Sequence, residues 1–221
     1  MERIAEERGK ALDIVELLMD SLSNNVGVFV FGRRLEHGHP KRRGLSRALR
    51  DQFTASRSGG VLGFRPEFVR SLAQRLSFTR SGSLVKAMAW MEKFLSHQLT
   101  WHRKTLGGDE NRDYMDAYLR KREGQENDET TTYSLACIVG NAMGLMIAGS
   151  NTVTAVLQRH LLLLAAHPDT VQARIQEEID AVIGCERPPA WEDRHAMPFT
   201  MATILECHRW HTLLPMGVPR R

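Results

Sequence analysis

The sequence is poor in cysteine, and its first residues show no signal-peptide pattern. Its three cysteines, Cys137, Cys185 and Cys207, are an odd number without paired spacing. This argues against a disulfide framework and fits a reducing compartment. The first ten residues, MERIAEERGK, are charged from the second position, unlike a signal peptide. No run predicts a strand longer than a few residues, so the expected fold class is mainly α.

Strong charge of one sign is also missing. The chain of 221 residues has a net charge of +4, which permits docking onto an acidic protein or an anionic lipid surface without requiring nucleic acid. The stretch 32–50 is basic but not interleaved with aromatic residues, so a nucleic-acid or nuclear-import role is the weaker alternative. We predict a solvated loop followed by an amphipathic helix over 45–53. His37 and His39 have no third metal ligand in sight.

The most informative absence is of charge between Tyr133 and Leu157. This stretch predicts a helix over about 132–166, roughly 50 Å long at ~1.5 Å rise per residue. Its length and the Gly140-x-x-x-Gly144 motif fit a membrane span. Its polar residues, however, would each need a partner in hydrocarbon, and its flanks lack an aromatic belt. The residues therefore favour a core helix wrapped by other helices, with a span as the open alternative.

Shorter helices are predicted around this one from apolar residues at helical spacing. Asp13 is a candidate cap for the main part of the first, and glycines or prolines end several others. The predicted segments are 1–25, 83–105, part of 109–122, 168–183 and 198–214. The long helix itself carries the sequence Ala148-Gly149-Ser150-Asn151-Thr152. Small residues there would let a flat partner approach, but simple helix–helix packing explains them equally well.

Several segments in register give the chain a resemblance to the cytochrome P450 superfamily, specifically its microsomal, animal family-2 group. The segments that carry it are 31–34 (FGRR), 112–119 (RDYMDAYL), 148–152 (AGSNT), 167–169 (HPD), 177–180 (EEID), 192–194 (EDR), 197–200 (MPFT), 206–209 (ECHR) and 215–220 (PMGVPR). The resemblance implies a single partial domain over 1–221 with the long helix at its centre, and it favours the core reading of that helix.

The resemblance also implies roles for individual residues. Thr152 would serve iron-bound oxygen, and Asn151 stands where the family usually has an acid, so it could hold a water but not relay protons as a carboxylate does. Ala148 and Gly149 would line the haem. Arg220 would face a haem propionate.

Further expected roles lie near the end of the chain. Glu206 and Arg209 match the family's Glu-x-x-Arg and would form a buried ion-pair network; the alternative is an exposed helical pair. The residues expected to line the substrate are Leu214, Met216 and Val218, with Leu213 beside them.

The family's function follows as an expectation. The resemblance implies that the parent protein is a haem-thiolate monooxygenase, which inserts one oxygen atom of O₂ into a lipophilic substrate. Its electrons would come from a flavoprotein reductase that oxidises NADPH. The parent protein would be held at the cytosolic face of the endoplasmic reticulum membrane by an amino-terminal anchor. We expect neither that anchor, nor the haem-ligating cysteine loop, nor a transmembrane segment in these residues, and therefore an inactive fragment that binds no nucleic acid. The alternatives are a decayed, non-catalytic copy and a helical membrane or adaptor protein.

Overall fold

A computed structural model describes residues 12–36, 38–56, 67, 73–76, 79–108, 110–123, 133–215 and 217. The elements assigned within these ranges are all helical, which confirms the mainly α class. They divide into two compact units, residues 1–151 and 152–221. The boundary falls inside the long helix α8 (Leu135–Ala166). The expectation of one domain over the whole chain stays a prediction.

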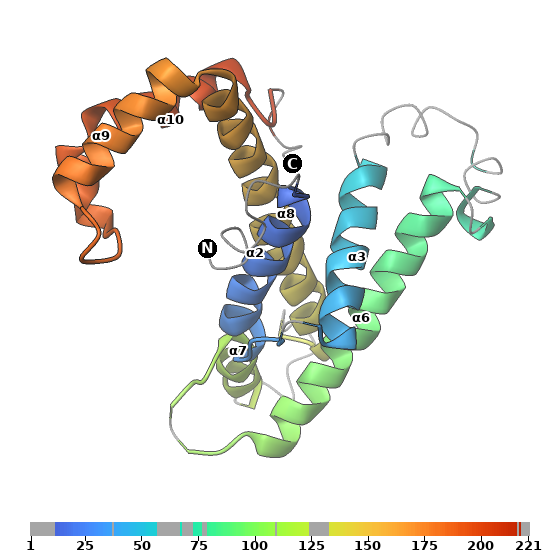
Figure 1. Cartoon of the computed structure of the whole chain (residues 1–221). Helices are drawn as coiled ribbons and strands as arrows, with labels where there is room; N and C mark the ends of the chain where they lie inside the picture. The colour runs from blue at the N-terminus through green and yellow to red at the C-terminus, as the bar shows by residue number, and fades with distance from the viewer. Residues whose placement is uncertain are drawn as a thin grey trace. The chain divides into compact units, whose positions relative to one another are not determined.

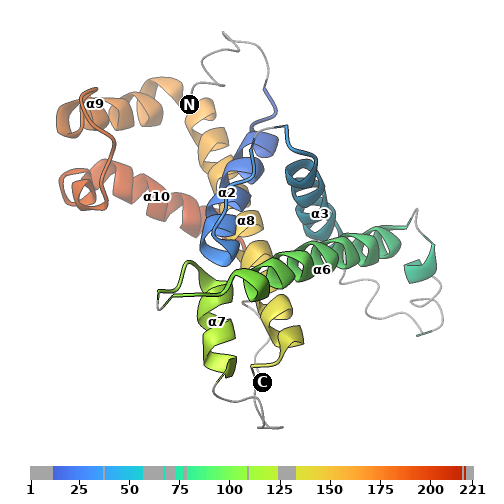
Figure 2. The same ribbon diagram turned by 90° about the horizontal axis from the view of Figure 1, so that it is seen from below.

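The first unit is built from α2 (Ile14–Phe31), α3 (Pro40–Ser56), α6 (Arg80–Thr105), α7 (Tyr114–Glu123) and the first half of α8. Helix α3 packs along α6, and α7 packs against both α2 and α6 (Figures 1 and 2). Helix α2 begins where the sequence predicts, because the Asp13 carboxylate accepts hydrogen bonds from the amides of Val15 and Glu16. It runs on through Phe31 and ends at Gly32, whose φ is +69°.

The core of this unit draws on every one of these helices. Fully buried side chains include Phe31 of α2, Leu49 of α3, Met91 of α6, Met115 of α7 and Met146 of α8. Each comes from an apolar stripe at helical spacing, so burial of this shared interior is the main stabilising term for the unit.

Close contact between α3 and α6 depends on a small residue. A Cβ at Gly44 would lie 2.4 Å from Cζ2 of Trp90, so only glycine lets α3 pass this indole. Trp90 in turn stacks on Phe94, with ring centroids 5.4 Å apart. The space left by the absent side chain of Gly44 on α3 is therefore filled by the stacked rings of Trp90 and Phe94 on α6.

An exposed loop precedes the predicted helix, but the helix begins earlier than residue 45, so part of the basic stretch is helical and not a solvated loop. Helix α3 begins at Pro40, and Arg42 is 3% exposed. Its guanidinium Nε lies 3.4 Å from Oδ2 of Asp20 on α2, and its Nη1 donates to the Leu35 carbonyl. The basic residue is buried because an acid and a carbonyl meet it there, which the local sequence does not reveal.

The second unit contains the rest of α8, a short π-helical turn η1 (Pro168–Gln172), α9 (Ala173–Val182), a 3₁₀ turn η2 (Trp191–Ala196) and α10 (Pro198–Trp210). Glu178 of α9 holds the start of α10, because its carboxylate accepts hydrogen bonds from the amides of Phe199 and Thr200 at 2.9 and 2.8 Å. Proline at the first position of α10 leaves no amide there to satisfy.

Within the part of the chain that the structure describes, two helices, α2 and α8, are long and apolar enough to cross a membrane by length and composition alone. In each, about a third or less of the most apolar window is buried: 28% in α2 and 33% in α8. The sequence predicts that α8 is wrapped on all sides, whereas here one face remains exposed. That face includes Gly140, Gly144, Leu145 and Ala148.

Candidate functional site on the long helix

The segment from Ala148 to Thr152 lies within α8, as the sequence predicts, and its side chains point to different sides. Ser150 and Asn151 are buried, at 0% and 3% exposed, whereas Ala148 is exposed and Thr152 is intermediate. A helix advances about 100° per residue, so neighbours in sequence cannot share one face. Residues 148 and 152, four apart, do share a face, and it is the more open one.

Asn151 is fixed by a partner that is distant in sequence. Its Nδ2 donates a hydrogen bond of 2.7 Å to Oε1 of Gln52 on α3. The amide's own Oδ1 is buried and has no hydrogen-bond partner among the described residues. A carboxamide bears no ionisable proton, so this position can orient a neighbour or a water but cannot relay protons as a carboxylate can.

Gly149 is explained by packing inside the first unit. A Cβ at this position would lie 2.7 Å from Cγ2 of Val26 on α2. By contrast, a Cβ at Gly140 or Gly144 would meet no atom within 4 Å. The missing side chain of Gly149 thus admits another helix, and its role beside a haem stays a prediction. Ala148 remains the exposed small residue of the segment.

The other predicted site residues lie in the second unit. Glu206 and Arg209 form a two-point ion pair on α10, with Nε–Oε2 at 2.7 Å and Nη2–Oε1 at 2.6 Å. Both side chains are largely exposed, so among the described residues this is the exposed helical pair, and its burial with a further arginine stays a prediction. Leu214 is 53% exposed, while Met216, Val218 and Arg220 lie outside the described residues.

The three cysteines occupy unlike environments. Cys137 and Cys185 are exposed, and Cys207 is 3% exposed. Burial raises the pKa of the Cys207 thiol and outweighs the opposing charge of Arg159. A haem iron of the thiolate class needs an ionised sulfur in a protected pocket. Cys207 is buried with a raised thiol pKa and the other two cysteines are exposed, and the expectation that the haem ligand lies outside these residues stays a prediction.

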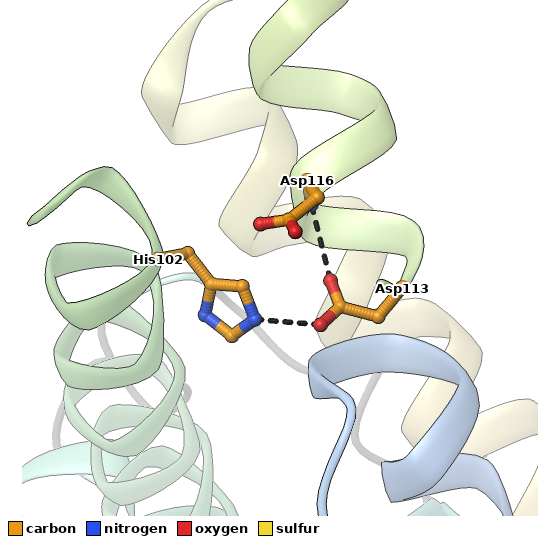
Figure 3. Close-up of side chains that lie close together, drawn as sticks. All are labelled: His102, Asp113 and Asp116. Carbon is orange, nitrogen blue, oxygen red and sulfur yellow. Dashed lines mark hydrogen bonds and ion pairs between the residues drawn. The ribbon is translucent and has the colours of Figure 1, made fainter. Parts of the chain in front are cut away.

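A buried polar cluster at the junction of α2, α6 and α7 was not singled out from the sequence. It consists of His102 on α6, Asp113 in the turn before α7, and Asp116 in the first turn of α7 (Figure 3). Nε2 of His102 lies 2.7 Å from Oδ2 of Asp113, and Oδ1 of Asp113 accepts from the Asp116 amide at 3.0 Å. Both acids lie in the segment 112–119, which the sequence marked only for its family resemblance.

The cluster resembles a metal site in its residue types but not in its hydrogen bonds and ion pairs. Nδ1 of His102 lies 2.8 Å from the Gln98 carbonyl, so both ring nitrogens already face oxygen acceptors. The guanidinium of Arg112 pairs with both carboxylate oxygens of Asp116. Burial alone would raise the pKa of Asp116, but the hydrogen bonds and charge of Arg112 hold it below its ordinary 3.8. The groups satisfy one another, which describes a structural ion network.

Comparison with known proteins assigns the chain to a family and agrees with its mainly helical class. The cytochrome P450 family profile matches residues 1–221, the whole chain. Among curated proteins, human cytochrome P450 2A13 is 32% identical, mouse cytochrome P450 2A5 is 31% identical and rabbit cytochrome P450 2A11 is 30% identical. Each alignment covers all of this chain but only 44–46% of the relative.

These observations define a mainly helical chain with a long helix that carries a segment of small and polar residues. The chain belongs to the cytochrome P450 family and is similar to its animal family-2 members. It spans less than half the length of the relatives it matches. Haem is the cofactor of that family, and this confirms the cofactor expected for the parent protein.

Proposed function

We propose that this chain is part of a haem-thiolate monooxygenase that inserts one oxygen atom of O₂ into a lipophilic organic substrate. The observation that carries the proposal is the family match over the whole chain, with Ala148 and Thr152 on the open face of α8. When bound, the haem of such an enzyme supplies oxygen binding and O–O cleavage. A flavoprotein reductase as electron donor and a location at the endoplasmic reticulum membrane belong to the same proposal.

The residues of this chain would shape the oxygen side of the site. The hydroxyl of Thr152 can both donate and accept a hydrogen bond, so it could hold a proton close to a bound oxygen ligand. Asn151 would orient this region without relaying protons, because Gln52 anchors its amide toward α3. Glu206 and Arg209 would stabilise α10, and Leu214 would approach the substrate. We also propose that α8 serves as a domain core helix rather than a span, since buried Ser150, Asn151 and Thr154 need polar surroundings.

A chimera tests the proposal. The whole chain replaces its matching segment in human cytochrome P450 2A13, which supplies the remaining elements. We expect the chimera to bind haem, to show the reduced CO-bound band of a thiolate ligand, and to oxidise a lipophilic probe slowly. In the same background, Asn151→Glu should raise product formed per NADPH consumed, whereas Asn151→Leu should not. A chimera that binds haem normally but gives no product in any variant would contradict the proposed activity.

A second candidate is a non-catalytic chain of the same family. It is favoured by the amide at residue 151, where the family usually has an acid. For the 221-residue chain expressed alone, both candidates predict no thiolate-type CO band. They differ in the natural transcript: only the monooxygenase requires a haem-ligating cysteine loop in the protein it encodes.

A further inference from the structure

The junction of α2, α6 and α7 contains a histidine whose two ring nitrogens both face acceptors. His102 is 0% exposed, and its partners are the Gln98 carbonyl at 2.8 Å and the Asp113 carboxylate at 2.7 Å. A neutral imidazole carries one N–H, so it could donate to only one of these oxygens and would turn a lone pair toward the other. An imidazolium donates to both. We propose that protonation of His102 controls the contact between α6 and α7. The imidazolium donates a hydrogen bond to the Asp113 carboxylate and so fixes the start of α7 against the end of α6.

The charges around His102 balance this assignment. Asp113 and Asp116 face it from the turn before α7 and from α7 itself, and their side chains are 2% and 1% exposed. Arg112, from the same turn, neutralises Asp116. From the end of α2, the guanidinium of Arg33 lies 3.5 Å from the centroid of the Trp101 ring, which is nearly perpendicular to the His102 ring at a centroid distance of 5.0 Å. With His102 protonated, the network has two positive and two negative groups, of which Arg112 is 38% exposed and the other three side chains are buried, whereas a neutral His102 would leave one carboxylate uncompensated.

The junction has little room to adjust. Gly32 ends α2 in the left-handed region, and a Cβ there would lie 2.6 Å from Oδ2 of Asp113, the atom that meets His102. Oδ1 of Asp113 accepts from the Asp116 amide and so caps α7. Release of Asp113 would therefore loosen two features at once, the contact with α6 and the first turn of α7. Figure 3 shows His102 and Asp113 joined across the gap between the two helices.

The direction of the pH effect follows from the same contacts. Burial alone would lower the pKa of His102, but the hydrogen bonds to Asp113 and Gln98 and the two nearby carboxylates outweigh it and raise the pKa above its ordinary 6.5. The folded chain thus holds the proton more tightly than the unfolded chain. The stabilisation is fully present below about pH 6.5 and is lost as the pH rises through the higher pKa of the folded state.

Histidine-selective ¹⁵N NMR of the full chain tests the protonation state directly. At pH 7 we expect His102 to show two protonated ring nitrogens, with its signals assigned by their loss in His102→Gln. Asp113→Asn keeps an oxygen acceptor but removes the charge, and it should lower the midpoint of His102 titration by about one pH unit, a tenfold change in proton affinity. His97→Gln, an exposed histidine on the same helix, is the matched control and should leave the His102 titration unchanged.

Hydrogen exchange supplies the structural readout. Between pH 6 and a pH above the His102 midpoint, protection of the Asp116 amide should fall about tenfold in the wild type after correction for intrinsic exchange, but not in Asp113→Asn. A neutral His102 at pH 7 would overturn the proposal, as would a titration unaffected by Asp113→Asn. Zinc added to the wild type should leave the His102 signals in place. A metal-induced shift would instead make the cluster a metal site. The hydrogen-exchange measurement on the wild type does not require His102→Gln to fold.

Discussion

Asn151 of α8 donates a hydrogen bond of 2.7 Å to Gln52 of α3, and 99 residues of sequence separate the two. This amide–amide contact joins the centre of the motif segment to a helix that the sequence does not connect with it. A buried amide that loses its partner is costly, so this pair offers a measurable test of the arrangement.

Gln52→Ala should destabilise the chain by about 1–3 kcal/mol, because Nδ2 of Asn151 would stay buried without its acceptor. Urea unfolding of Gln52→Ala, Asn151→Ala and the double variant forms a mutant cycle. We expect a coupling of about 1 kcal/mol, with the double variant less destabilised than the sum of the two single variants. Strictly additive effects would show that the two side chains do not interact.

The glycines of α8 should respond differently to substitution. Gly149→Ala places a methyl group 2.7 Å from Val26 and should cost about 1–3 kcal/mol of unfolding free energy. Gly140→Ala meets open space in the same helix and should stabilise the chain by about 0.5–1 kcal/mol. Thermal or urea unfolding compares the two. Val26→Ala should recover part of the loss in Gly149→Ala, and failure to do so would place the clash elsewhere.

Prediction from sequence worked where a helix is specified by its own residues. Asp13 caps α2, and the charge-free run does form the long helix α8, because capping and apolar spacing act locally. It failed for Arg42, whose burial depends on Asp20 of another helix. Likewise, nothing local distinguishes Gly149, which faces Val26, from Gly140, which faces open space.

The place of the segment 148–152 on a long helix was predictable from sequence, whereas its contacts were not, and its role beside a haem stays a prediction. The segment ending at Thr152 was found by resemblance, whereas the Gln52 partner of Asn151 comes from tertiary packing alone. The His102–Asp113 contact was not predicted from the sequence, because it depends on the conformation of the turn between α6 and α7. Such pairings are set by helix geometry across the whole unit, and a single sequence does not encode them in any short pattern.

The ion pair between Arg187 and Asp193 should control one acid titration in the second unit. The two guanidinium contacts, both 2.8 Å, together with the Ala190 amide lower the pKa of Asp193 from 3.8 to about 2. Because the folded pKa is depressed, any stabilisation is present above about pH 4 and is lost as the pH falls toward 2. Carboxyl ¹³C NMR of Arg187→Gln should show the Asp193 midpoint moving back toward 3.8. Arg194→Gln is the control and should leave that midpoint low.

Thiol labelling should separate the three cysteines. Cys137 and Cys185 are exposed and should react with a maleimide within minutes at pH 7.5, whereas buried Cys207, with its raised thiol pKa, should react at least tenfold more slowly. Mass spectrometry should then find two labels on the native chain and three after denaturation. Rapid labelling of Cys207 in the native chain would contradict its burial.

The carboxylate of Glu178 has a consequence for how the second unit opens. It is the acceptor for the first amides of α10, yet it belongs to α9, 21 and 22 residues earlier in the chain. Unwinding of α9 at this point would leave Phe199 and Thr200 without their cap, and fraying of α10 would leave the acid without donors. The two helices therefore share one opening event, and their amides should exchange with solvent as a single cooperative group rather than helix by helix.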